Sequence, residues 1–179
     1  MHSITTRESD TPALSWDDAP RHSDIEAVRA LVHATGVFSA EEVRIAGELV
    51  EDTLSFGEDY AFVFARSGKK LVGYTCFGEI PLTDNRYDLY WIAVAPGLHG
   101  RSVAAELLRR TEQRIRNSGG RIIYAETSSG EHYAPARRFY LKNGFEECAH
   151  IPDFYKLGDA KLIYSKRLQP AGAPRFSTV

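Results

Sequence analysis

The hydrophobic positions of the chain change from a helical to a strand-like period near residue 60. Before that point, apolar residues recur at helical spacing in two runs, each preceded by a Ser-x-x-Glu capping box, at Ser23–Glu26 and Ser39–Glu42. Gly36 and Gly57 follow the two runs and can end helices. The pattern therefore predicts two helices, over about 23–36 and 39–57.

Strand-like runs follow at 61–65 and 71–77, and Ser67-Gly68-Lys69 between them predicts a hairpin turn. The segment 88–94 (Asp-Leu-Tyr-Trp-Ile-Ala-Val) is almost continuously apolar, which predicts a strand buried on both faces. A helix is predicted over about 101–117, and a strand over 121–125. Strand, helix and strand at these distances predict a right-handed βαβ unit with two parallel strands.

The predicted helix 101–117 is amphipathic. Its expected inner face carries Val103, Ala104, Leu107, Leu108, Thr111 and Ile115. Its expected outer face carries Glu106, Arg109, Arg110, Glu112 and Arg116. One face should therefore pack on the sheet and the other should meet solvent.

The last third of the chain predicts one more helix and two strands. Pro135 can start the helix and Gly144 can end it, and the strands fall at about 145–151 and 161–168. A loop holding Phe154 and Tyr155 is expected between them. The whole order predicts an α+β fold: a mixed, mostly antiparallel sheet with a central parallel βαβ crossover and helices on both faces.

Length and composition favour a single domain, over residues 13–168, with disordered tails at 1–12 and 169–179. There is no apolar run that resembles a signal peptide, and none approaches the ~18 residues of a membrane span. The formal net charge of −2 argues against binding to nucleic acid or to an acidic membrane. Cys76 and Cys148 both lie in strand-like segments and are expected to be buried free thiols, which favours a reducing, cytoplasmic location.

The segment from residue 88 to 108 predicts a phosphate site. A buried strand runs through a turn of small residues into a helix N-terminus, where backbone N–H groups and the helix dipole favour an anion. The expected position is Gly100 to Ala104. Neither GxxxxGK[ST] nor GxGxxG is present, and no histidine spacing such as HExxH predicts a metal.

Two segments resemble the GNAT superfamily of acetyltransferases. His99-Gly100-Arg101-Ser102-Val103-Ala104 is similar to the family's acetyl-CoA-binding turn, Q/R-x-x-G-x-G/A; Ala104 matches, whereas His99 and Ser102 depart from the pattern. Residues 136–145 resemble the family's A-x-x-x-Y-x-x-x-G-F signature, with its tyrosine at Tyr140. The resemblance spans about residues 70–168.

The chain is also similar to small bacterial GNAT proteins, some of which carry a D-alanine N-acetyltransferase label. The shared elements are DLYWI at 88–92, ETSS at 126–129, the segment 133–140, and DFY-x-x-GD at 153–159. The arrangement from Glu126 to Tyr140 resembles ribosomal-protein N-terminal acetyltransferases as well. Tyr133 replaces the asparagine usual in those enzymes, and the intervening loop is longer, which disfavours a peptide N-terminus as the acceptor.

The resemblance implies an N-acetyltransferase that uses acetyl-CoA as its acetyl donor, without a metal. The acceptor is expected to be a primary amine of a small molecule or an amino acid. The residues expected to bind the cofactor are Ile92, Ala93, Val94, His99, Gly100, Arg101, Ser102, Val103, Ala104, Tyr133, Arg137 and Tyr140. In the family the tyrosine lies beside the CoA sulfur, so Tyr140 is expected to protonate the leaving thiolate.

Acetyl transfer needs a neutral amine, whereas alkyl amines titrate near ~10, so a carboxylate that takes the proton is expected. Glu126, at the end of the strand where the parallel pair should separate, is the first choice for this base, and Glu79 is the second. Asp88 and Tyr90 can face the acceptor from the opposite strand. Phe38, Phe56, Phe154 and Tyr155 suggest a small, partly apolar acceptor pocket.

Three questions stay open in the sequence. A non-catalytic acyl-CoA-binding sensor or partner module is the alternative to an enzyme, because Ser102 stands where glycine is usual. Another donor such as succinyl-CoA ranks lower, since no extra cation is evident for its carboxylate. A homodimer is compatible with the family, although no apolar stripe demands one.

Overall fold

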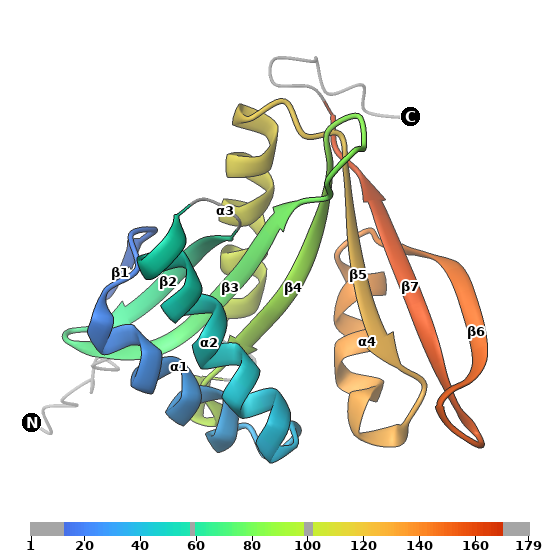
Figure 1. Cartoon of the computed structure of the whole chain (residues 1–179), viewed down its shortest axis with the longest axis horizontal. Coiled ribbons are helices and arrows are strands. Elements are labelled where there is room, and N and C mark those ends of the chain that lie inside the picture. The colour runs from blue at the N-terminus through green and yellow to red at the C-terminus, as the bar shows by residue number, and fades with distance from the viewer. Residues whose placement is uncertain (1–12, 58–59, 99–101, 170–179) are drawn as a thin grey trace, which may run out of the picture.

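A twisted sheet of seven strands, in the order β1-β2-β3-β4-β5-β7-β6, organises the protein (Figure 1). The computed structural model describes residues 13–57, 60–98 and 102–169. The tails predicted at 1–12 and 169–179 lie outside these residues, apart from Gln169. The elements are β1 (Leu14–Asp17), α1 (His22–Ala34), α2 (Ala40–Phe56), β2 (Ala61–Ser67), β3 (Lys70–Glu79), β4 (Arg86–Val94), η1 (Pro96–Leu98), α3 (Val103–Asn117), β5 (Ile122–Ser128), η2 (Glu131–Tyr133), α4 (Ala134–Lys142), β6 (Glu146–Lys156) and β7 (Asp159–Arg167).

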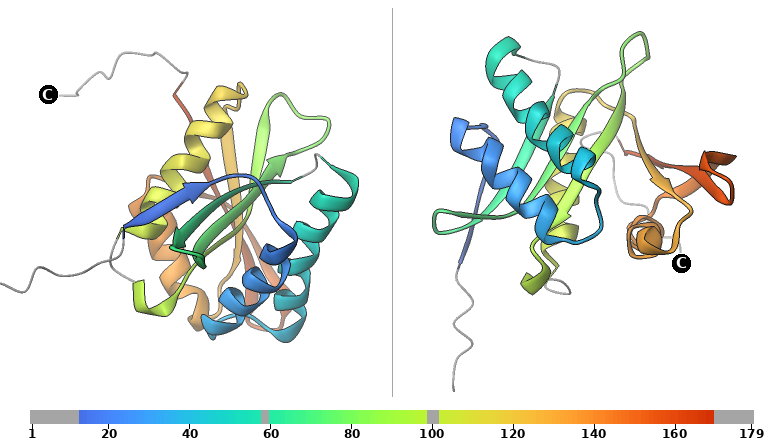
Figure 2. Two further views of the ribbon diagram at one scale, coloured as in Figure 1. Left: turned by 90° about the vertical axis from the view of Figure 1, so that its left-hand side faces the viewer. Right: turned by 60° about the horizontal axis from the view of Figure 1, so that its bottom comes forward.

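Every neighbouring pair of strands is antiparallel except β4 and β5, which are parallel and joined through α3. Helices α1 and α2 cover one face of the sheet, and α3 and α4 lie on the other (Figures 1 and 2). The predicted α+β fold, with its single parallel crossover and helices on both faces, is confirmed. Figure 1 also shows that no helix lies in front of β5, β7 and β6 on the face that α1 and α2 cover elsewhere.

Two apolar cores follow from this arrangement. Between the sheet and the first helix pair lie Val28, Val50, Phe62, Phe64 and Tyr74. The core on the other face contains Leu107, Leu108, Ile115, Ile123 and Phe145. Strand residues alternate between the two cores, because successive side chains of a strand point to opposite faces.

The two N-terminal helices begin in different ways. Helix α2 has the predicted capping box: Glu42 Oε2 accepts from the Ser39 N–H at 2.8 Å, and Ser39 Oγ accepts from the Glu42 N–H at 3.3 Å. The box predicted at Ser23 is wrong, because α1 begins at His22 with Arg21 as its N-cap. Asp24 Oδ2 accepts from the Arg21 N–H at 3.0 Å and so caps this helix.

Some strand predictions are also corrected. Strand β1 is a short edge strand with no clear sequence signal. Strand β6 continues to Lys156, so Phe154 and Tyr155 lie on a strand and not in a loop. Cys148 is exposed on this edge strand, whereas Cys76 is a buried free thiol as predicted.

Two predictions of burial are wrong for a physical reason. Glu112, expected on the outer face of α3, is buried because it accepts from both Arg116 and Lys166. Strand β4 is not buried on both faces, since Tyr90 is exposed. The pairing with β3 passes from Trp91 to Leu89 and skips Tyr90, so a bulge interrupts the alternation there.

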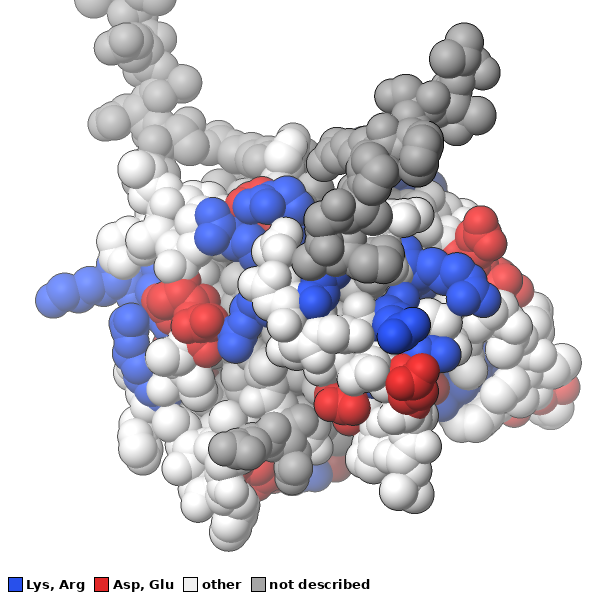
Figure 3. Space-filling model, turned by 90° about the horizontal axis from the view of Figure 1, so that it is seen from above, with Lys and Arg blue, Asp and Glu red and all other residues white. Residues whose placement is uncertain are grey.

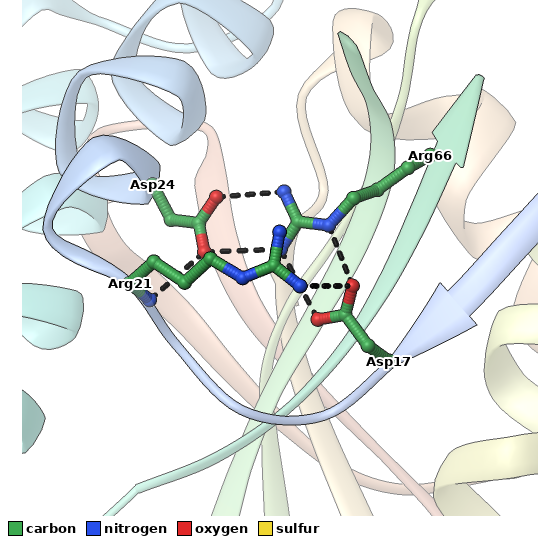
Figure 4. A network of polar contacts seen from close by, with 4 residues as sticks. All are labelled: Asp17, Arg21, Asp24 and Arg66. Atoms are coloured by element: carbon green, nitrogen blue, oxygen red, sulfur yellow. Dashed lines mark hydrogen bonds and ion pairs between the residues drawn. The ribbon is translucent and has the colours of Figure 1, made fainter. Parts of the chain in front are cut away.

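A buried ionic cluster ties β1 and α1 to the sheet (Figure 4). The guanidinium of Arg66 on β2 donates to Asp17 at 2.6 and 3.1 Å and to Asp24 at 2.7 and 3.0 Å. Both carboxylates raise the pKa of Arg66. The cluster fills the bend between β1 and α1 with fully paired charges, so neither carboxylate is left without a partner in the interior.

Apart from the Arg66 cluster and the buried Glu112, many charged side chains lie on the surface. Seen from the end of the molecule that is uppermost in Figure 1, basic and acidic side chains lie side by side (Figure 3). Within the described residues, no helix has both the length and the apolar character needed to cross a membrane.

The Arg66 cluster gives a prediction for stability. Asp24→Ala removes one partner of a buried arginine together with the cap of α1, so the free energy of unfolding should fall by about 3–5 kcal/mol. Urea unfolding measures this loss.

Glu41→Gln is the matched control, because Glu41 pairs with Arg44 on the exposed face of α2 and such pairs contribute little. If Asp24→Ala loses no more stability than Glu41→Gln, the Arg66 cluster does not hold the N-terminal elements.

Candidate functional site

The site begins where β4 and β5 separate. The two strands pair only at Arg86–Ile122, Tyr87–Ile123 and Asp88–Tyr124, and Figure 1 shows them diverging below this point. A cavity of about 590 Å³ lies at the open end. This volume is within the usual range for small-molecule sites.

Several segments line the cavity. They include the end of β4, the start of α3, one side of α4, and the aromatic residues of the α1–α2 connection and η2. The lining residues include Ile92, Ala93, Val94, Ser102, Val103, Ala104, Phe38, Tyr133, Ala136, Phe139 and Tyr140. Eight of the residues expected to bind the cofactor are therefore brought together. His99, Gly100 and Arg101 lie outside the described residues.

The start of α3 supplies backbone N–H groups to this cavity. The first turns of a helix leave N–H groups without helical partners, and these favour an anion. Ser102, the N-cap residue, has φ of +61°, in the left-handed region. Glycine adopts this conformation without strain, which gives a physical reason for the glycine usual in the resembling motif.

Tyr140 lies on α4. Its ring belongs to the core between the sheet and α3 and α4, and the residue also lines the cavity. The residue is 6% exposed, and its ring lies 5.4 Å from that of Phe145 and 5.7 Å from that of Tyr164. Burial raises the pKa of Tyr140 to about 12. Its hydroxyl therefore keeps its proton throughout the neutral range.

Tyr133 and Arg137, both expected at the cofactor, have different surroundings. The Tyr133 hydroxyl donates to Glu42 Oε1 at 3.1 Å and so links η2 to α2. Burial, followed by the Glu42 charge, raises the pKa of Tyr133 to about 12. Arg137 donates to the carbonyl oxygens of Ser128 and Gly130, both at 2.8 Å, so it holds the turn after β5 and does not line the cavity.

Glu126 and Asp88 lie on the two separating strands, on the face opposite α3 and α4. Their neighbours in sequence, Ala125 and Leu89, belong to the core of α3 and α4, so these carboxylates point to the other side. Burial, and then the charge of Glu126, raises the pKa of Asp88, whereas Lys161 lowers it. The two carboxylates and Lys161 thus form one electrostatic group.

Lys161 is a residue that sequence reasoning missed. Its Nζ lies 2.5 Å from Glu126 Oε2 and 4.2 Å from the centre of the Phe154 ring. Its position on β7 depends on strand register, because Lys161 pairs with Ser128 and β7 lies between β5 and β6. The alternation of apolar residues along 159–167 would have placed Lys161 outside the core, but not beside Glu126.

Glu79 lies elsewhere. It ends β3 opposite Tyr87, near the closed end of the β4–β5 pair. Its charge is among the causes that raise the pKa of Tyr87, after burial. The structure therefore does not bring Glu79 to the open end with Tyr140 and Glu126.

Asp159 completes the turn between β5 and η2. Its Oδ1 accepts from Ser128 Oγ at 2.5 Å and from Ser129 Oγ at 3.4 Å, and the hydrogen bond from Ser128 lowers the pKa of Asp159. Within the described residues, no group of three or more His, Cys, Asp or Glu side chains is placed to hold a metal ion.

Comparison with protein families places this geometry in a known group. Residues 25–145 match the acetyltransferase (GNAT) family. The chain belongs to this family. Membership makes acetyl transfer its class of reaction.

Solved structures agree with the GNAT assignment. A protein from Desulfovibrio desulfuricans, assigned to the GNAT acetyltransferases, is 40% identical with a TM-score of 0.85, and the match covers 88% of this chain and 100% of the other. No curated protein matches the sequence.

Two more distant structures share the GNAT fold. The Salmonella typhimurium protein yncA, solved with acetyl-CoA, is 18% identical with a TM-score of 0.68 over 90% of this chain and 98% of its own. The Escherichia coli ribosomal-protein-S18-alanine N-acetyltransferase is 16% identical with a TM-score of 0.69, over 91% and 100%. At these identities the likeness concerns the fold alone.

The left-handed conformation of Ser102 predicts an effect on the stability of this GNAT domain. Ser102→Gly should raise the free energy of unfolding by up to about 1 kcal/mol, because relief of a left-handed residue exceeds the added chain entropy of glycine. Urea unfolding measures the change.

Ser118→Gly is the matched control at the other end of α3, where φ is −86° and glycine relieves nothing. This control should be slightly destabilised. Equal losses in the two variants would contradict the argument.

The charges around Asp88 predict the direction of two pKa changes. Glu126→Gln should lower the pKa of Asp88, because a neighbouring negative charge is removed, and Lys161→Met should raise it, because a favourable positive charge is removed. A carbon-detected NMR titration of the Asp88 carboxyl group measures both changes.

Lys156→Met serves as the control, since this lysine is exposed on the same hairpin and is not among the causes of the Asp88 shift. An unchanged titration of Asp88 in Glu126→Gln would mean that the two carboxylates do not interact.

Proposed function

We propose that this protein is an acetyl-CoA-dependent N-acetyltransferase, which transfers the acetyl group to a primary amine of a small molecule or an amino acid by direct attack on the thioester. One observation carries the proposal. Residues at the start of α3 and Tyr140 line one cavity where β4 and β5 separate, while Glu126 and Asp88 lie on the same two strands at the opposite face.

The cavity suits the donor. The N–H groups from Ser102 to Ala104 would hold the pyrophosphate, as helix N-termini do. Beyond Asp88, β4 forms no ladder with β5, and the pantetheine arm would lie in this gap beside Ile92 and Ala93. His99, Gly100 and Arg101 remain expected cofactor residues, and the acetyl-CoA bound to the Salmonella protein supports the choice of donor.

The chemistry divides between the two sides of the sheet. Glu126, directly or through a water molecule, takes the proton from the incoming ammonium and leaves a nucleophilic amine. A backbone N–H of the Ile92–Val94 segment stabilises the oxyanion, a contribution of about 3 kcal/mol in other enzymes. Tyr140 donates its proton to the leaving thiolate. Because the pKa of a thiol is near ~8.5, the thiolate takes up a proton at neutral pH.

The aromatic residues beside the cavity favour a small acceptor. Phe38 lies 4.9 Å from the Trp91 ring and 6.3 Å from the Tyr133 ring, and the Tyr133–Glu42 hydrogen bond closes the space between η2 and α2. The Tyr133–Glu42 hydrogen bond leaves little room for a peptide chain to pass between η2 and α2. A cytoplasmic location and a homodimer stay predictions of the sequence.

The role of Tyr140 gives the test. Tyr140→Phe should reduce kcat by about 10²–10⁴-fold, the usual contribution of a general acid, while the Kd for acetyl-CoA changes only a few-fold. Release of free thiol with a panel of amino acids and small amines measures kcat, and calorimetry measures binding.

Tyr164→Phe is the matched control, because this buried tyrosine contacts the Tyr140 ring but does not line the cavity. Its kcat should remain near that of the wild type. Tight binding of acetyl-CoA without turnover of any amine would favour the sensor or partner module. No binding at millimolar acetyl-CoA would contradict the donor site itself.

A further inference from the structure

Lys161 places a primary amine of the protein itself beside the carboxylate that the proposed function uses as its base. The ammonium lies 2.5 Å from Glu126 Oε2, and the Lys161 side chain is 17% exposed. The ring of Phe154 lies on its other side, with Nζ 4.2 Å from the centroid. An alkyl ammonium is thus held between a carboxylate and an aromatic ring at the open end of β4 and β5.

The fold fixes this position from three strands. Leu162 and Tyr164 belong to the core of α3 and α4, so Lys161 on β7 points to the opposite face, toward Glu126 on β5. Asp88 on β4, at the last pair before the strands separate, is affected by the charges of both residues. Lys161 therefore lies beside the carboxylate that an external amine would also have to approach.

The other lysines of the described residues have different surroundings, and one of them, Lys142 at the end of α4, lines the cavity on the α3 and α4 side. Lys166 lies on the α3 side of the sheet, 2.5 Å from the buried Glu112. Lys156 is exposed on the same β6–β7 hairpin, and Lys69 and Lys70 are exposed at the β2–β3 turn. These provide internal standards for the intrinsic reactivity of a lysine with acetyl-CoA.

We propose that Lys161 is a self-acetylation site: in the absence of an external amine, the protein transfers the acetyl group of bound acetyl-CoA to the Nζ of its own Lys161. The inference rests on the proposed function, because it uses the same donor and the same base. Proximity favours this reaction, since an amine held inside the complex reacts as though present at a very high concentration.

In the transfer to Lys161, the lysine nitrogen replaces the CoA sulfur on the acetyl group. Glu126 takes one proton from the Lys161 ammonium, and the neutral Nζ attacks the thioester carbonyl carbon. The C–N bond forms, the C–S bond breaks, and the CoA thiolate takes the Tyr140 proton. The nitrogen loses its second proton to the Tyr140 oxygen as the amide forms, and Glu126 releases the first proton to solvent, so the products are acetyl-lysine, CoA thiol and one free proton.

Acetylation changes the electrostatics of the site. The modified side chain carries no charge, so it no longer pairs with Glu126. Glu126 and Asp88 then lose the cation that pairs with the first and lowers the pKa of the second. The acceptor side of the site therefore exists in two charge states, which depend on whether acetyl-CoA has been present without an amine.

The experiment needs no knowledge of the natural acceptor. The purified full-length protein is incubated with acetyl-CoA in a buffer free of amines, and intact mass spectra are recorded over time against the starting spectrum. We expect a gain of one acetyl group, located at Lys161 by peptide mapping. The rate should be independent of protein concentration, because the transfer occurs within one complex.

Variants distinguish this transfer from ordinary chemical acetylation. Lys161→Arg should lack the adduct and still bind acetyl-CoA, whereas Lys156→Arg should gain it at the wild-type rate. Glu126→Gln should slow labelling of Lys161 at least about 100-fold, the lower range for a lost general base, with labelling of Lys156 unchanged.

Three results would overturn the inference. Labelling spread over Lys156, Lys69 and Lys70, at rates that Glu126→Gln does not alter, would be chemical acetylation. Thiol release with small amines while Lys161 stays unmodified would refute self-acetylation and leave the proposed function standing. Failure to bind acetyl-CoA would refute the proposed function, and the inference with it.

Discussion

The short parallel contact between β4 and β5 is the constraint on which the rest of the structure depends. Three residue pairs join the strands, and beyond Asp88 and Tyr124 they separate. Beyond Asp88, β4 forms no ladder with β5, and the cavity opens at this end beside α3 and α4. Side chains alternate along both strands, so Asp88 and Glu126 point to the opposite face, near the point where the strands separate.

A sheet divided in this way needs other contacts to hold its halves in place. Lys166 on β7 and Arg116 on α3 both bind Glu112 of α3. This buried carboxylate therefore links β7, on one side of the separation, to the helix that packs on the strands of the other side. At the open end, the hydrogen bond from Tyr133 to Glu42 performs a similar task. These paired polar contacts add to the apolar core that α3 and α4 share with β4, β5 and β7, which spans both halves of the sheet.

The sequence predicted the parts of this arrangement that depend on local pattern. The helices, the crossover and the approach of Tyr140 to the start of α3 follow from periodicity and from motifs with a fixed chain order. Lys161 and the burial of Glu112 were missed because both depend on the register of β7, which no local signal sets. Glu79 was chosen as a strand-end carboxylate, but strand ends occur at both ends of a sheet, and only the pairing with Tyr87 shows which end it occupies.

The pairing of Glu126 with Lys161 bears on which carboxylate can accept a proton. The Oε2 oxygen, 2.5 Å from the Lys161 ammonium, is already engaged, so an external amine must meet the other oxygen of Glu126 or displace Lys161. Asp88 is half-buried, and its pKa is raised chiefly by burial, which makes it a stronger proton acceptor than an ordinary aspartate. Loss of the Lys161 charge raises the pKa of Asp88 further and frees Glu126 at the same time. The lysine thus pairs with Glu126 and lowers the pKa of Asp88, and the acceptor side of the site is best understood as a group of three residues with one shared charge balance.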